Sequence, residues 1–258
     1  TGGYPAEYGR ATGGIINAVS KSGTNDLMIA GHLNWEPAEF ASNAPDTYRD
    51  RNGTDKRDNF SAVIEAGGPV IRDRLFAYGL IEFRDVRNEH SSIADGARYI
   101  DRDTSPIWGV KVDAYPLDNH HLEFTYFDTG TERVRTTLAY DGATDTVGDE
   151  ISETRYRAGG VSYIGRYTGN LADWFTISGA YGVSEERSDY RTSNNRNYVR
   201  DELTGVVISD QKLPDITSPY STRREFYRFD ADLYFSIAGD HHVRFGMDHE
   251  NNRLEKVS

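Results

Sequence analysis

Nine segments of this chain alternate between apolar and polar residues, and this pattern constrains the fold more than any other feature. The segments cover residues 27–36, 60–66, 75–83, 108–114, 121–126, 161–167, 175–184, 228–237 and 243–250. A period of two residues is typical of a β-strand with one apolar and one polar face. Residues 75–83 are apolar on both faces, and we place Ala77, Ile81 and Phe83 on the apolar face, opposite Tyr78. The sequence therefore predicts an all-β chain whose sheet has two chemically different faces.

The two faces suggest two different surroundings. We expect the apolar face to meet lipid through Leu33, Trp35, Val110, Phe124, Tyr163, Ile177, Leu233 and Phe245. The opposite positions are polar or charged, namely His32, Asn34, Glu65, Glu82, Lys111, Asp113, Glu123, Arg166, Asp230, Asp232 and Arg244. Because unpaired charge is costly in a dry core, we expect these residues to face a water-filled lumen.

The connections between the segments alternate in length. Short turns lie at 67–73, 116–119, 169–173 and 239–241, whereas long polar connections lie near 37–56, 88–105, 134–153 and 188–222. Outer-membrane β-barrels have short periplasmic turns and long external loops. The pattern thus predicts an antiparallel transmembrane β-barrel. No run approaches the ~18 apolar residues of a membrane helix.

The first 26 residues contain a distinct motif. It consists of Glu7, Tyr8, Gly9, Arg10, Gly13, Gly14, Asn17 and Lys21, followed by the turn Ser22-Gly23-Thr24-Asn25. The whole string resembles the C-terminal end of the plug domain of TonB-dependent outer-membrane receptors. Residues 67–76, Gly-Gly-Pro-Val-Ile-Arg-Asp-Arg-Leu-Phe, resemble a hairpin turn of the Oar-like branch of that family, and residues 111–116 resemble its next turn.

The resemblance implies a domain division and a set of partners. Residues 1–26 would end a plug domain, and residues 27–258 would form the first part of a barrel of 22 strands. The partners would be outer-membrane lipid, TonB with its inner-membrane motor, and an unidentified extracellular ligand. The location would be the outer membrane of a Gram-negative bacterium, and the function active uptake. Glu7 and Arg10 match plug positions that pair with barrel carboxylates in related receptors.

Several other functions find no support in the residues. The chain has 41 acidic against 29 basic residues, which argues against nucleic-acid binding. It has no cysteine, and no nucleophile elbow or phosphate-binding loop occurs, so we expect neither an enzyme nor a cofactor. Neighbouring strand residues point to opposite faces, so the pairs His120-His121 and His241-His242 do not predict a metal site. The acidic loop 135–153 is open to a Ca²⁺ interpretation, although a solvated loop is the simpler one.

The strand count predicts an incomplete barrel. Nine is an odd number, whereas bacterial single-chain barrels use even numbers. Unpaired strand edges do not occur in hydrocarbon, so we expect the first strand to pair with a strand absent from these residues. Two alternatives stay open: a surface barrel for adhesion or export, and a soluble secreted β-protein that binds glycans.

Overall fold

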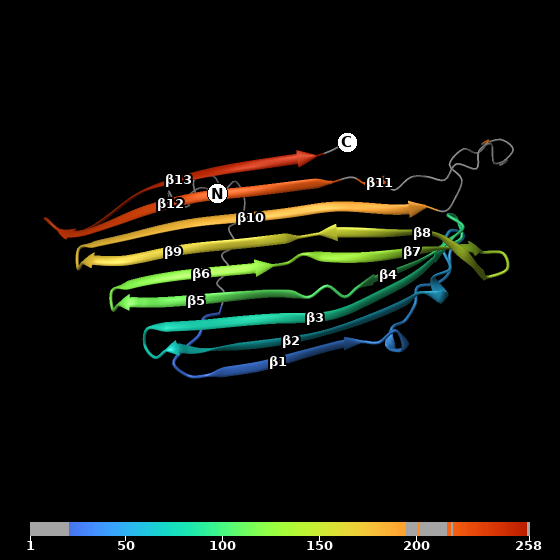
Figure 1. Cartoon of the computed structure of the whole chain (residues 1–258), viewed down its shortest axis with the longest axis horizontal. Coiled ribbons are helices and arrows are strands. Elements are labelled where there is room, and N and C mark those ends of the chain that lie inside the picture. Colours follow the sequence, from blue (N-terminus) through green and yellow to red (C-terminus); the bar gives the residue numbers. More distant parts are fainter. Residues whose placement is uncertain (1–20, 195–200, 202–215, 218, 257–258) are drawn as a thin grey trace.

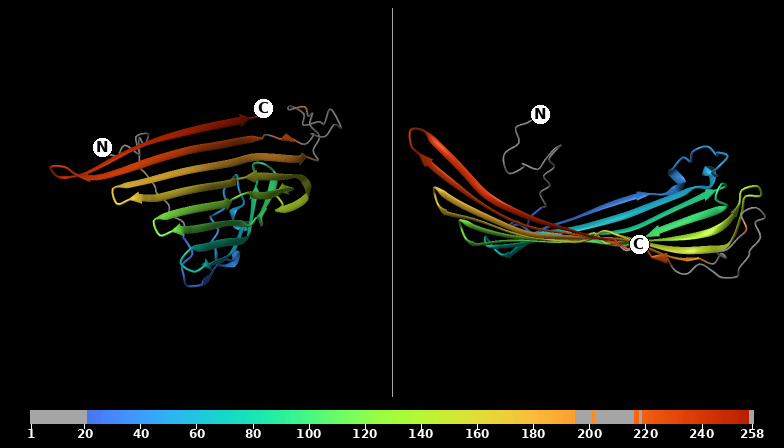
Figure 2. Two further views of the ribbon diagram at one scale, coloured as in Figure 1. Left: turned by 60° about the vertical axis from the view of Figure 1, so that its left-hand side comes forward. Right: turned by 90° about the horizontal axis from the view of Figure 1, so that it is seen from above.

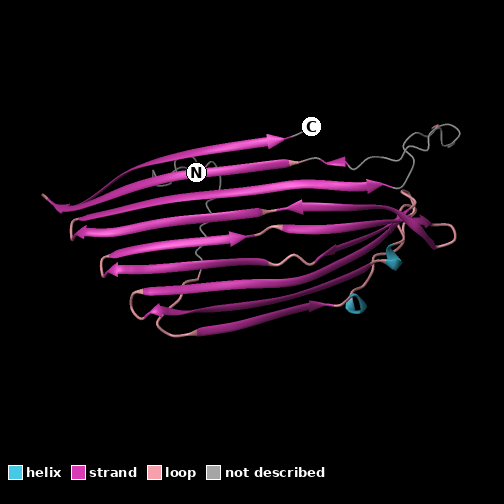
Figure 3. Cartoon of the chain, viewed as in Figure 1, coloured by secondary structure: helices cyan, strands magenta, loops and turns pink. Residues whose placement is uncertain are grey.

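The computed structural model describes residues 21–194, 201, 216–217 and 219–256. Most of them belong to one antiparallel sheet (Figures 1 and 3). Its strands are β1 (Met28–Glu36), β2 (Lys56–Ile71), β3 (Leu75–Ser92), β4 (Ala97–Asp103), β5 (Ile107–Leu117), β6 (His120–Asp128), β7 (Thr131–Asp141), β8 (Thr146–Ala158), β9 (Gly160–Ala172), β10 (Phe175–Asn194), β11 (Ile216–Thr217), β12 (Tyr220–Ser236) and β13 (Asp240–Lys256). Two 3₁₀ turns, η2 (Ala38–Phe40) and η3 (Asn52–Thr54), lie between β1 and β2.

The sheet runs from β1 to β3, divides into two branches, and reunites at β10. The part of β3 nearer the short turns pairs with β5, and the sheet continues through β6 and β9. The other part of β3 pairs with β4, followed by β7 and β8. Both branches pair with β10, and β12 and β13 complete the sheet. The pairs β4/β5, β6/β7 and β8/β9 thus act as three long strands, each interrupted by a short break.

The nine expected strands are present, but they extend further than the sequence indicates. Residues 88–103 and 131–158, assigned mainly to long loops, instead form the end of β3 and all of β4, β7 and β8. These segments are rich in Arg, Asp, Glu and Thr, so they lack the hydropathy contrast that identified the other strands. Cross-strand ion pairs hold them together, including Arg135 with Asp101 at 2.8 Å. The connecting turns are therefore short at both ends of these strands.

The register gathers the apolar positions of neighbouring strands on one face of the sheet, which we call the apolar face. Leu33 lies opposite Ala62, Val112 opposite Phe124, and Leu233 opposite Val243. No second layer covers this face in the described part of the chain. Leu33 and Phe245 are accordingly 65% and 53% exposed. The aromatic residues are therefore not packed between two sheets, as a β-sandwich would require.

Aromatic side chains mark one border of the apolar face. The residues are Trp35, Phe60, Phe83, Trp108, Tyr126, Tyr163, Tyr181 and Tyr227, which we call the aromatic row. Several of them touch, with ring centroids 5.0 Å apart for Trp108 and Tyr126 and 4.9 Å for Tyr181 and Tyr227. The next positions on this face are charged, for example Asp85 after Phe83 and Glu185 beyond Val183. From Leu75 to Phe83 the apolar stretch of β3 is about 26 Å long at ~3.3 Å per residue. At the ~35–45° tilt of barrel strands this length spans about 20 Å along the membrane normal, somewhat less than the ~25 Å apolar band of outer-membrane barrels.

The sheet is curved and twisted, and its two lateral edges are open (Figure 2). Among the described strands β1 pairs with β2 alone and β13 with β12 alone, and the two lie at opposite edges. The fold is thus a partial barrel wall and not a closed nine-stranded barrel. The four short turns expected from the sequence gather at one end of the strands (Figure 1), and the short β3–β4 and β7–β8 turns lie at the other. In one of them Asp73 takes a left-handed conformation with φ of 62°.

Within the described residues, no helix is long and apolar enough to span a membrane.

Candidate functional site: the polar face of the sheet

The face opposite the apolar one carries the charged residues singled out from the sequence, and we call it the polar face. The register places all of these residues on it, and neighbouring strands supply adjacent positions. They are His32, Asn34, Glu65, Glu82, Lys111, Asp113, Glu123, Arg166, Asp230, Asp232 and Arg244. That this face lines an aqueous lumen stays a prediction.

A buried charge cluster occupies the centre of the polar face on β5, β6 and β9. Lys111 is 4% exposed and its Nζ lies 2.8 Å from Glu123 Oε2 and 3.9 Å from Asp113 Oδ1. Arg166 approaches the other oxygen of Glu123 at 3.8 Å. Asp113 is 3% exposed, and its Oδ2 has no hydrogen-bond partner in the structure. The cluster balances its charges, which is the condition under which buried ions are tolerated.

His121 joins this cluster, which sequence reasoning missed. Its Nε2 lies 2.8 Å from Asp113 Oδ1, and its ring stacks on Tyr115 with centroids 4.5 Å apart. His121, Asp113 and Glu123 place one ligand atom each within 4.8 Å of one another. Lys111 already supplies a positive charge at this point, so an added metal ion would have to displace its ammonium group. The vicinal pair His120-His121 does diverge, because His120 contacts Tyr167 at 2.6 Å instead.

A second charge cluster lies on β12 and β13. Arg228 Nε donates to Asp230 Oδ2 at 2.6 Å, and His242 Nε2 lies 2.7 Å from Asp232 Oδ1. Arg244 lies within 3.8 Å of Asp230 and 3.7 Å of Asp232. Both aspartates are 9% exposed. The polar face therefore carries paired charge at its centre and near the β13 edge.

The segment before β1 reaches the polar face through Lys21. Its Nζ donates to both oxygens of Glu65, at 2.8 and 2.9 Å. The hydroxyl of Tyr78 donates to the same carboxylate. Tyr78 stands opposite Lys111 on the next strand, so this contact lies beside the central cluster. The other plug-motif residues lie outside the described residues; they are Glu7, Tyr8, Gly9, Arg10, Gly13, Gly14 and Asn17.

Beyond the aromatic row, ion pairs stabilise the extensions of the strands. On the polar face Arg84 pairs with Asp103 at 2.8 Å, and the Arg133 guanidinium lies 4.5 Å from the ring centre of Tyr156. On the other face Glu89 is 8% exposed and pairs with Arg98 at 2.5 Å and with Arg87 at 2.8 Å. Burial raises the pKa of Glu89, but the hydrogen bond from Arg98 and the charges of Arg87 and Lys56 outweigh it and hold that pKa below its usual value.

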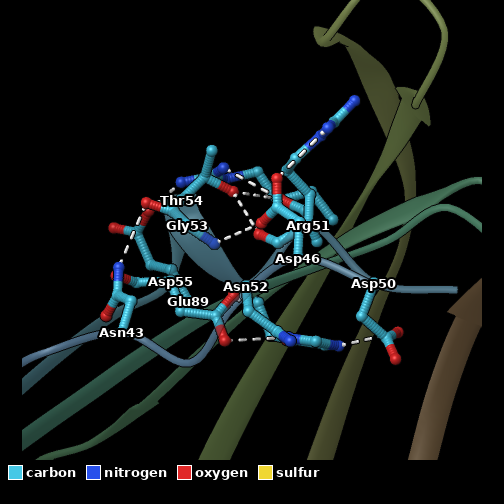
Figure 4. A network of polar contacts seen from close by, with 12 residues as sticks. Asn43, Asp46, Asp50, Arg51, Asn52, Gly53, Thr54, Asp55 and Glu89 are labelled. Carbon is cyan, nitrogen blue, oxygen red and sulfur yellow. Dashed lines mark hydrogen bonds and ion pairs between the residues drawn. The ribbon is translucent and has the colours of Figure 1, made fainter. Parts of the chain in front are cut away.

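The connection between β1 and β2 folds into a compact polar cap (Figure 4). Asp46 accepts a hydrogen bond from the Gly53 backbone at 2.7 Å and one from Arg51 at 3.2 Å, and both lower the pKa of Asp46. Asn43 donates to the carbonyls of Gly53 and Asp55 at 3.1 and 3.0 Å.

Arg51 attaches this cap to two neighbouring hairpins. Its Nη2 donates to the Gly142 carbonyl in the β7–β8 turn at 2.9 Å, and its backbone N–H donates to the Ser91 carbonyl of β3 at 2.9 Å. The ends of three hairpins therefore form one connected surface. The sequence signal for this surface was the polar composition of residues 37–56, which predicted a long connection but not its contacts.

Comparison with known proteins adds one relationship. Part of the chain is similar to the TonB-dependent transporter Oar of Myxococcus xanthus, with 30% identity over 107 residues, or 39% of this chain. The aligned region spans only 10% of that protein. No protein-family model matches, and no solved structure matches. The similarity supports a relationship to TonB-dependent transporters, which act as transporters and not as enzymes.

Proposed function

We propose that this chain forms part of the barrel wall and the end of the plug of an outer-membrane TonB-dependent transporter that actively imports a ligand. In this proposal residues 1–26 end the plug and residues 27–258 form the first strands of an Oar-like barrel. The chain spans about a tenth of the relative that it matches, so uptake and the TonB partner belong to this proposal.

The observation that carries the proposal is the contrast between the two faces of one uncovered sheet. The apolar face has an aromatic border and a height that approaches that of a hydrocarbon layer, as a lipid-facing wall requires. The polar face holds ionised groups in cross-strand pairs, which suits a wet interior filled by a polar plug. A soluble protein rarely exposes an apolar surface of this size, which argues against the soluble glycan-binding alternative.

The Lys21–Glu65 contact suggests how a plug could be both held and released. Lys21 is 61% exposed along its side chain. A solvated ion pair contributes only ~0–1 kcal/mol. Several such contacts would hold the plug at rest and yield under a modest pull from TonB. We expect Arg10 and Glu7 to make comparable contacts with wall residues.

Cysteine labelling tests the membrane placement. The chain has no cysteine, so single cysteines at Leu33 and Phe245 on the apolar face can be compared with cysteines at Asn34 and Ser178 on the polar face. In outer membranes we expect a water-soluble maleimide to label the polar-face pair and a membrane-soluble maleimide to label the apolar-face pair. Equal labelling of all four sites by the water-soluble reagent would contradict the proposal.

A second labelling experiment tests the coupling to TonB. A cysteine that replaces Lys21 should react with a water-soluble maleimide faster in energised cells than in cells that lack TonB. The matched control is a cysteine at Asn34, which lies on the wall and should react at the same rate in both strains. If the Lys21 position is also indifferent to TonB, this segment is not a mobile plug end.

A further inference from the structure

Two grooves lie one above the other on the apolar face, across β9, β10 and β12. The lower groove, of about 610 Å³, lies within the apolar band and is walled by Phe124, Tyr167, Tyr181 and Phe229. The upper groove, of about 620 Å³, begins at Val161, beyond the aromatic row. Along β10 the lower groove reaches Tyr181 and the upper one begins at Glu185, about 13 Å further at ~3.3 Å per residue.

Glycines form the floor of the lower groove. Gly165 lies opposite Tyr181, and Gly179 lies opposite Tyr167, so the two glycines are staggered between large rings. A Cβ atom at Gly165 would meet nothing within 4 Å, and one at Gly179 would come no closer than 3.8 Å to the Arg228 carbonyl. The groove is therefore a real depression with room for a chain of methylene groups.

The upper groove follows from the division of the sheet into two branches. Gly159 has φ of 82° and separates β8 from β9, so the surface opens next to β10. The lining has four arginines and four glutamates, and Glu186 belongs to a position that points to the polar face. Cation and carboxylate are thus nearly balanced here, whereas the whole chain has a net charge of −12.

Three of the arginines have carboxylate partners that leave them accessible. Arg157 pairs with Glu132 at 2.8 Å and is 57% exposed, and Arg253 pairs with Glu255 at 2.5 Å and is 73% exposed. Arg223 pairs with Glu185.

Two features make this arrangement favourable for an added anion. Arg223 and Arg253 stand directly opposite each other on β12 and β13, where like charges are unfavourable. Arg187, on the same face, makes no ion pair with any described residue. Arginine groups so placed suit bidentate binding of phosphate.

We propose that the two grooves form a binding site for one phosphate-bearing lipid of the external leaflet. The headgroup phosphate would contact Arg187, Arg223 and Arg253, and one acyl chain would lie in the lower groove over Gly165 and Gly179. The proposal rests on the outer-membrane placement proposed above. Charge complementarity selects this occupant. On this face the upper groove has four arginines against three glutamates, and it lies directly beyond an aromatic border, so it matches an anionic headgroup above an apolar tail. If a partner helix or a second copy of the chain occupied the grooves instead, its binding would not depend on a phosphate group.

The test measures lipid binding by the complete transporter of which this chain is proposed to be a part, purified into phosphatidylcholine nanodiscs. The added probe is lipid A with both phosphates, compared with its dephosphorylated form, and the readouts are bound lipid by native mass spectrometry and the midpoint of thermal unfolding. A ligand that binds only the folded state raises that midpoint. We expect one tightly bound phosphorylated lipid and at least ten-fold weaker binding of the dephosphorylated form.

Variants separate the headgroup from the tail. Arg187→Gln with Arg223→Gln should weaken binding at least ten-fold, and Gly165→Leu should do the same by filling the lower groove. The matched controls are Arg102→Gln, an exposed arginine paired with Asp85 outside the grooves, and Gly31→Leu, where a Cβ meets only a carbonyl 3.8 Å away. Both controls should stay within two-fold of the unmodified protein. If Gly165→Leu does not fold, Gly179→Leu tests the same groove.

Three results would overturn the proposal. An equal loss of lipid binding in Arg102→Gln would show that the arginines act through general attraction to the membrane surface. Unchanged lipid binding in the folded groove variant would exclude the lower groove as the site of the acyl chain. If the unmodified protein is a dimer and Gly165→Leu makes it monomeric, the lower groove is occupied by a second copy of the chain. Failure of the unmodified complete transporter to enter nanodiscs would instead refute the membrane placement, so the two proposals fail in different ways.

Discussion

The buried ion cluster around Lys111 gives the sharpest test of the polar face, because removing one partner leaves a buried carboxylate without its counter-charge. In Lys111→Met the side chain keeps its bulk but loses its ammonium group. Glu123 and the 3%-exposed Asp113 then share the site without the cation that lies 2.8 Å from one and 3.9 Å from the other. Removing one partner of a buried pair costs about 3–5 kcal/mol. Because Glu123 keeps 16% of its side-chain exposure, we expect the lower end, about 3 kcal/mol.

The measurement is urea-induced unfolding of the complete barrel to which this chain is proposed to belong, in lipid vesicles and followed by tryptophan fluorescence. The matched control is Arg102→Met, because Arg102 and Asp85 form a pair at 2.8 Å with side-chain exposures of 62% and 45%. An exposed pair contributes ~0–1 kcal/mol. Adding Glu123→Gln to Lys111→Met should restore part of the loss, since one uncompensated carboxylate is then removed. If Lys111→Met costs no more than Arg102→Met, the polar face is well solvated and the cluster is not structurally important.

Three further predictions address the lipid-facing band, the strand extensions and the division of the sheet. Leu233→Arg should destabilise the protein in vesicles by about 2–4 kcal/mol if the site lies near mid-bilayer, whereas Tyr234→Arg on the polar face should cost much less. The pKa of Glu89 lies below its unfolded value of ~4.3. Its contribution to stability is therefore complete above that pH and lost as the pH falls through the folded pKa; Glu89→Gln should flatten the acid limb of the stability curve between these values. Gly160→Ala would put a Cβ 2.0 Å from the Glu185 carbonyl oxygen, so it should lower the thermal midpoint more than Gly165→Ala, whose Cβ is unobstructed.

The sequence by itself determined the strands and the chemistry of their two faces. The period-two pattern is a local property, because successive side chains of a strand point to opposite faces whatever the partner strand is. Leu233 and Asp232 could therefore be assigned to opposite faces of the sheet without knowledge of which strands pair. The same reasoning failed for residues 97–103 and 131–158. In these segments the positions on both faces are polar, so hydropathy does not alternate along the chain. Only the cross-strand ion pairs show that the segments are strands.

The tertiary structure alone decided which charges meet. Lys111 pairs with Glu123 because a short turn brings β6 back along β5 in one register; a shift of one residue would place Glu123 on the other face. His121 enters the same cluster for that reason. The contact between Lys21 and Glu65 joins residues far apart in the chain, and so does the cap contact between Arg51 and Gly142. The two grooves depend on the division of the sheet at Gly159, which brings β8 and β9 successively against β10. Such features arise from the relative placement of several strands, and no local pattern of residues encodes that placement.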